Sequence, residues 1–299
     1  MSHSYDSASR PEELSALAAL ARRLQARVNR AVQHGEELSR LIQDWMATEP
    51  IRTEIVVAPD RLWWELRVDV SSPPYDDWAT AFGDGVHNLR AALDNLVWGL
   101  ATLGGNEPIQ PTRVQFPIVE RRSEWRMERA RISALPPAAQ AAIELVQPFQ
   151  RSGPDGEPAS DALLLLNRLS NREKHRLAIE PTMTPSEISH ACSVDFGSDE
   201  AAELNVPPDV VLSADAFVQG AVLIRQVTKT PILDVKGEYA FKGQVVVIDS
   251  IAGGLGVTTI LSQLAHYVPQ VINLVLQSSA AAIDTPDASA SASPIGPEV

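Results

Sequence analysis

The feature that most constrains this chain is a long run of apolar residues at alternating spacings of three and four. The run extends from Leu14 to Trp45. This spacing places the apolar side chains on one stripe of an α-helix that packs in coiled-coil fashion. Ser9-Arg10-Pro11-Glu12 has the pattern of a capping box with proline in the first turn. We therefore predict a long first helix, whose apolar stripe packs either within its own domain or against a second copy of the chain.

Hydrophobic periodicity predicts the remaining elements. A hairpin is expected from alternating β-prone residues, and each later helix from apolar spacing with turn residues at its ends. Downstream of residue 180, β-branched residues dominate and indicate strands. The predicted strands are 53–57, 62–70, 189–196, 210–212, 216–227 and 239–248, and the helices that follow the first are 78–103, 123–132, 138–146, 161–178 and 258–276.

These helices and strands fall in blocks, which favours the α+β class over a doubly wound parallel sheet. We expect a helical layer, an antiparallel sheet and a C-terminal helix. The predicted organisation is a single α+β domain over 11–277, flanked by disorder at 1–10 and by a disordered tail at 278–299, where Ala, Ser, Pro and Asp dominate. Within the domain, a helical part covers about 11–180, a β-rich part about 186–250 and the last helix about 258–277.

Composition narrows the class of protein. Hydrophobic content of 44% and charged content of 21% are ordinary for a globular chain. The single cysteine, Cys192, excludes an internal disulfide framework. The polar N-terminus has no signal-peptide pattern, and the apolar runs are too short to cross a bilayer, so we expect a cytoplasmic protein without membrane contact.

The charge of the chain is unevenly distributed. A net charge of −13 argues against a protein that coats DNA. Between Arg113 and Arg176, however, eleven Lys and Arg residues stand against eight Asp and Glu residues. This central segment is where an anionic ligand would find a favourable field.

Polar residues on the predicted helix 78–103 form the first half of a candidate site. His87, Arg90 and Asp94 fall on the side opposite its main apolar stripe. Trp98 lies in line with them, which suggests that this side is covered too. Buried polar groups need partners, and these three are close enough along the helix to satisfy one another in part.

The predicted helix 161–178 offers the second half. Asn171, Lys174 and His175 share one arc of that helix. If the two helices pack together, the six residues form a set suited to general acid–base chemistry, and the neighbouring arginines would bind phosphate. Those arginines are Arg168, Arg172 and Arg176. The alternative is a structural hydrogen-bond network that fixes how the helices pack.

Two resemblances accompany these residues. Gly85-Val86-His87-Asn88-Leu89-Arg90-Ala91-Ala92-Leu93-Asp94, followed by Asn171-Arg172-Glu173-Lys174-His175-Arg176, resembles an uncharacterised family of bacterial proteins, as do Phe116-Pro117-Ile118 and Gln147-Pro148-Phe149 between them. This resemblance covers about 78–179 and implies no known activity.

A looser resemblance is to the HEPN superfamily, helical domains that include metal-independent ribonucleases. Their mark is an arginine followed a few residues later by a histidine on the same helix face, as in Arg168 and His175. Leu169 departs from that pattern, because members of the superfamily usually have a polar residue directly after the arginine. The β-rich part is also foreign to the HEPN fold.

Weaker signals do not alter this interpretation. The glycine-rich stretch before Thr258 lacks the lysine of a P-loop and reads as a connection. His87, Asp94 and His175 are chemically suitable metal ligands but lack ligand spacing, so no metal or cofactor is expected.

Two functions stay open. One is a nucleic-acid-directed enzyme of HEPN-like ribonuclease type, acting on RNA or another phosphate-bearing ligand. The other is a non-catalytic binding or self-assembling protein, associating as a homo-oligomer through the Leu14–Trp45 helix, in which the cluster is structural.

Overall fold

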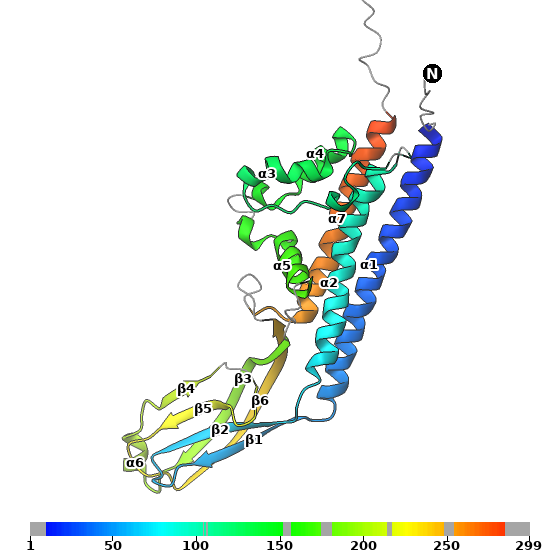
Figure 1. The fold of residues 1–299 in the computed structure, drawn as a ribbon. Coiled ribbons are helices and arrows are strands. Elements are labelled where there is room, and N and C mark those ends of the chain that lie inside the picture. Colours follow the sequence, from blue (N-terminus) through cyan, green and yellow to red (C-terminus); the bar gives the residue numbers. More distant parts are fainter. Residues whose placement is uncertain are drawn as a thin grey trace, which may run out of the picture. The chain divides into compact units, whose positions relative to one another are not determined.

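The computed structural model describes residues 10–103, 105, 107–151, 157–174, 181–213, 217–247 and 254–284. Helices and two antiparallel sheets make up the fold, which confirms the α+β class (Figure 1). The helices are α1 Arg10–Met46, α2 Tyr75–Ala101, α3 Arg122–Glu128, α4 Pro137–Leu145, α5 Ala162–Lys174, α6 Asp199–Glu203 and α7 Val257–Asp284. The strands are β1 Ile51–Val57, β2 Trp63–Val70, β3 Pro181–Asp195, β4 Asp209–Leu212, β5 Val222–Val227 and β6 Asp234–Val247.

The contacts of the chain divide it into two compact units. One, the helical unit, comprises Met1–His34, Gly83–Arg176 and Leu261–Val299, and the other, the β-rich unit, comprises Gly35–Phe82 and Leu177–Ile260. Three of the four boundaries between them fall inside α1, α2 and α7. That 11–277 forms a single domain stays a prediction from the sequence.

In the helical unit, α1 contributes the apolar stripe that its spacing predicts. Leu17, Leu24 and Val28 are buried within the chain. Gly99 of α2 lies directly against α1, because a Cβ atom built there would be 2.4 Å from Cδ1 of Leu20. The stripe is therefore covered by elements of its own chain, and association of α1 with a second copy stays a prediction.

Short elements complete the helical unit between α2 and α5. They include 3₁₀ turns at Pro111–Arg113 (η1), Arg129–Ile132 (η2), Pro148–Gln150 (η3) and Pro158–Ser160 (η5). Proline occupies the start of η1, η3 and η5, where its missing N–H costs no hydrogen bond. These turns lie along the connection from α2 to α5.

The β-rich unit confirms the predicted hairpin, because β1 and β2 pair antiparallel. A four-stranded sheet has the order β1-β2-β5-β4, and β3 pairs with β6 in a second sheet. Trp64 is fully buried, and its indole Nε1 donates to Oε1 of Gln226 at 3.0 Å. The ring centroid of Trp64 in β2 lies 6.4 Å from that of Tyr239 in β6, so the two sheets are in contact at this point.

Helix α7 is longer than the sequence suggested. It continues to Asp284, so residues 278–284 are helical rather than part of a disordered tail. Ser279 is buried, and its hydroxyl donates to the carbonyl of Val275 at 2.8 Å. The alanines that follow are strong helix formers. Arg10 is likewise helical, whereas 1–9 and 285–299 lie outside the described residues. In the described part of the chain, no helix has the length and apolar character needed to span a membrane.

Candidate functional site

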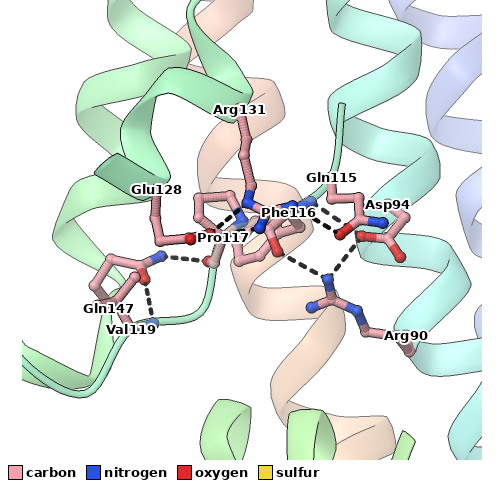
Figure 2. A network of polar contacts seen from close by, with 9 residues as sticks. All are labelled: Arg90, Asp94, Gln115, Phe116, Pro117, Val119, Glu128, Arg131 and Gln147. Carbon is pink, nitrogen blue, oxygen red and sulfur yellow. Dashed lines mark hydrogen bonds and ion pairs between the residues drawn. The ribbon is translucent and has the colours of Figure 1, made fainter. Parts of the chain in front are cut away.

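Arg90 and Asp94 lie one turn apart on α2 and form an ion pair, with Arg90 Nη2 3.0 Å from Asp94 Oδ1. Both also hold the backbone of Phe116. Arg90 Nη2 donates to the Phe116 carbonyl at 2.9 Å, and the Phe116 amide donates to Asp94 Oδ1 at 3.0 Å (Figure 2). One residue of an irregular segment thus has both of its backbone groups satisfied by a single helix face. We call Arg90 and Asp94 the α2 clamp.

Gln147 holds the same segment from another side. Its side chain is fully buried, accepts from the Val119 amide at 3.0 Å and donates to the Pro117 carbonyl at 2.9 Å (Figure 2). The same amide nitrogen lies 3.1 Å from the carbonyl of Ile143 in α4. The α2, Phe116-Pro117-Ile118 and Gln147-Pro148-Phe149 motifs therefore meet in one place, joined by hydrogen bonds between side chains and backbone groups.

A second arginine lies beside the α2 clamp. Arg131 Nη1 donates to Oε1 of Gln115 at 3.2 Å, and its guanidinium forms an ion pair with Glu128 (Figure 2). Burial lowers the pKa of Arg90 from its ordinary value, and the charge of Arg131 lowers it further, whereas Asp94 acts in the opposite direction. Arg90 is thus a buried cation whose main compensation is one carboxylate.

One nitrogen of that buried cation is unsatisfied. Nη1 of Arg90 is inaccessible to solvent and has no hydrogen-bond partner among the described residues. A buried donor without an acceptor costs about 1–3 kcal/mol. Of the two terminal nitrogens of Arg90, it is Nη2 that contacts the Phe116 carbonyl and Asp94.

His87 lies on the same side of α2, one turn before Arg90, but it is exposed. Within the part of the chain that the structure describes, its imidazole has no hydrogen-bond or ion-pair partner. The predicted trio on this helix is therefore divided. Arg90 and Asp94 contact each other, and His87 faces solvent.

The half of the candidate site on α5 is only partly described. Asn171 and Arg168 are exposed, and Arg172 is half-buried. The Lys174 backbone ends the helix, while its side chain, together with His175 and Arg176, lies outside the described residues. The convergence of the two polar sets consequently stays a prediction. Among the described residues, no group of three His, Cys, Asp or Glu side chains is arranged to hold a metal ion.

A second arginine–aspartate pair lies elsewhere in the helical unit, where sequence reasoning assigned no role. Arg151 Nε lies 2.8 Å from Oδ2 of Asp161, and its Nη2 donates to the hydroxyl of Tyr267 in α7. Asp161 Oδ1 accepts from the Leu163 amide at 2.8 Å, which caps α5. A capping aspartate directly before a helix can be recognised in the sequence. Its partner Arg151, 10 residues away, and the contact of Arg151 with Tyr267, 116 residues away, cannot.

The contact residues Gln147, Gln115 and Arg131 were also missed as site residues. Each bonds a group that is distant in sequence, so periodicity along one helix carries no information about them. Comparison with models of known protein families, with curated proteins and with solved structures found no match.

Proposed function

We propose that this protein is a non-catalytic binding protein in which the α2 clamp maintains the shape of the helical unit. The proposal is supported mainly by the hydrogen-bond partners of Arg90 and Asp94. Their hydrogen bonds go to the backbone of Phe116, and Arg90 is buried. A general acid, a general base or a phosphate ligand must reach a substrate. Arg90 is buried, and Oδ1 of Asp94 is engaged by Arg90 and by the Phe116 amide.

Exposed apolar side chains support a binding role. In the helical unit Ile109 and Met127 are exposed, and in the β-rich unit Val211 and Val218 are exposed. Single exposed apolar residues are ordinary on protein surfaces, but apolar residues that line a depression mark interaction sites. Ile109 and Met127 line one such depression, and Val211 and Val218 line another.

A ribonuclease of HEPN type is the second candidate. It is favoured by the exposed imidazole of His87, which is accessible to a substrate, and by the exposed Arg168 on α5. In this alternative His175 acts as acid or base, and Arg168 binds phosphate. The clamp of Arg90 and Asp94 would then position the helix that carries His87.

One assay separates the two candidates. The purified chain is incubated with mixed labelled RNA, with and without chelator, beside His87→Ala and His175→Ala variants. The binding proposal expects intact RNA for all three proteins. Cleavage that persists in chelator and is lost in His175→Ala would overturn it in favour of the ribonuclease. Cleavage that both variants retain points to a contaminating nuclease, which further purification removes before the comparison is repeated.

A further inference from the structure

A cleft in the helical unit lies between residues 108–114 and residues 127–134. Its volume is about 700 Å³. One wall is the segment that leads into and through η1, and the other is formed by the end of α3 and by η2. Arg131 lines the cleft and also donates to Gln115, a contact drawn in Figure 2. The cleft therefore adjoins the segment that the α2 clamp holds.

The walls of the cleft expose apolar side chains to water. Ile109 is 100% exposed and Met127 is 74% exposed. Covering exposed hydrophobic side chains with a partner lowers the free energy of the complex. Methionine is enriched in protein interfaces, because its flexible thioether adapts to different surfaces. These two walls are therefore suited to receive an apolar side chain of a partner.

The cleft also holds an arginine without a carboxylate partner. Arg113 is exposed, and Nη1 donates to the neutral Oε1 of Gln110 at 3.1 Å. Among the described residues it forms no ion pair, whereas Arg131 in the same cleft is paired with Glu128. The lining thus retains one positive charge that no acidic side chain compensates, in a chain whose net charge is −13.

We propose that this cleft binds an acidic peptide segment of a partner protein. An apolar side chain of the segment packs between Ile109 and Met127, and a neighbouring carboxylate accepts two hydrogen bonds from the guanidinium of Arg113. The exposed Arg126 and Arg129 beside the cleft attract further acidic residues. This inference rests on the proposed binding function and specifies its partner.

The composition of the cleft favours a peptide over a nucleic acid. Nucleic-acid binding depends on several cations that follow a row of phosphates. The cleft instead pairs one uncompensated arginine with two exposed apolar side chains. A small molecule is also disfavoured, because ligand pockets enclose most of the ligand, whereas Ile109 and Met127 are open to solvent.

The test uses the full chain and a panel of short fluorescein-labelled peptides that contain Asp, Glu, Leu and Ser in different orders. Fluorescence anisotropy measures binding. Matched peptides with Asn and Gln in place of the acids are the neutral probes, and a labelled single-stranded RNA is the nucleic-acid probe. We expect at least one acidic peptide to bind and its neutral counterpart to bind about tenfold more weakly, the change that ~1.4 kcal/mol produces.

Substitutions in the cleft test whether the acidic peptide binds there. Arg113→Gln and Met127→Ser should each weaken binding of the acidic peptide by roughly five- to tenfold, as expected for one charge-assisted hydrogen bond or one buried side chain. Arg113→Lys should fall between wild type and Arg113→Gln, because it keeps the charge and loses the paired hydrogen bonds. All substituted side chains are exposed, so thermal melts should match wild type.

The chain offers close controls for both substitutions. Arg30 of α1 is exposed and, like Arg113, donates to a glutamine three residues away, so Arg30→Gln removes the same charge and the same kind of hydrogen bond. Leu145 is exposed at the end of α4, so Leu145→Ser matches Met127→Ser. Neither control should change the affinity.

Three results would overturn the inference: no acidic peptide binds, Arg30→Gln weakens binding as much as Arg113→Gln, or RNA is the probe whose binding depends on Arg113. A chain that leaves RNA intact and binds no acidic peptide loses this inference but keeps the proposed function. A chain that cleaves RNA by way of His175 loses the proposed function, whatever the peptides do.

Discussion

Two arginine–aspartate pairs in the helical unit differ in which of the two side chains is the more buried. In the α2 clamp the arginine side chain is 7% exposed and the aspartate 26%. In the pair of Arg151 and Asp161 the arginine side chain is 38% exposed and the aspartate 1%. Burial lowers the pKa of Arg90, whereas the hydrogen bond to Asp161 raises the pKa of Arg151. One pair therefore buries a cation and the other buries an anion.

This difference determines what each aspartate does. Asp94 compensates a cation that water does not reach, and it shares the Phe116 backbone with that cation. Asp161 is itself the buried charge, and it is stabilised by the Leu163 amide as well as by Arg151. Removal of Asp94 strands a buried charge, whereas removal of Asp161 leaves a cation that water can solvate.

The largest expected effect comes from Asp94→Ala. Loss of the carboxylate leaves Arg90 buried and uncompensated, which should lower the free energy of unfolding by about 3–5 kcal/mol. Denaturant melts measure this change. Asp44→Ala is the control, because Asp44 also forms an ion pair with an arginine four residues earlier on a helix, Arg40. In that pair both side chains are exposed. That control should cost at most about 0.5 kcal/mol. Equal losses in the two variants would contradict the structural role of the α2 clamp.

A smaller effect is expected from Asp161→Ala. The variant loses the cap of α5 and the hydrogen bond from Arg151, which together should cost about 1–2 kcal/mol. Asp161→Asn should recover part of this, because asparagine caps a helix about as well as aspartate does. The same melts serve here. A loss larger than that of Asp94→Ala would reverse the comparison between the buried cation and the buried anion.

The smallest effect concerns alkaline pH. Burial raises the pKa of Tyr267 above its ordinary value of 10.0, and the charge of Asp161 raises it further, while Arg151 lowers it. The folded chain then keeps the phenol proton to higher pH than the unfolded chain does. The associated stability is fully present below pH 10 and is lost as the pH rises through the pKa of the folded state.

Tyr267→Phe should therefore make the fall in stability above pH 10 less steep, as measured by denaturant melts across the alkaline range. The fall should not vanish, because burial also raises the pKa of Tyr75 and of Tyr239. An unchanged slope in Tyr267→Phe would show that burial and the charge of Asp161 do not hold the phenol in its protonated form.

Sequence reasoning succeeded where one element carries the whole signal. The spacing of α1 predicted its buried stripe, alternation predicted the β1–β2 hairpin, and a separation of four placed Arg90 and Asp94 together. It failed where composition competes with helix propensity. Residues 278–284 look like a tail by their Ser and Ala content, yet Ser279 turns inward and bonds the preceding turn.

The other contacts of the candidate site could not be predicted from the pattern of any single helix or strand. Phe116 is 22 residues from Asp94 and 26 from Arg90, and Gln147 is 28 from Val119. These contacts depend on how η1, α3 and α4 return to α2, which no local pattern encodes. The motifs around Phe116 and Gln147 resemble a known family, but neither pattern indicates that the Phe116 backbone and the Gln147 side chain make these hydrogen bonds.

The interleaving of the two units along the chain has a consequence for biosynthesis. Neither unit is a continuous stretch: the β-rich unit is complete only once Ile260 has been made, and the helical unit also needs the segment that begins at Leu261. Domains made of one continuous stretch can fold on the ribosome one after another. Residues of α1 and of α7 belong to the same unit, so we expect its final packing to follow synthesis of α7 and to be slowed by long-range contacts.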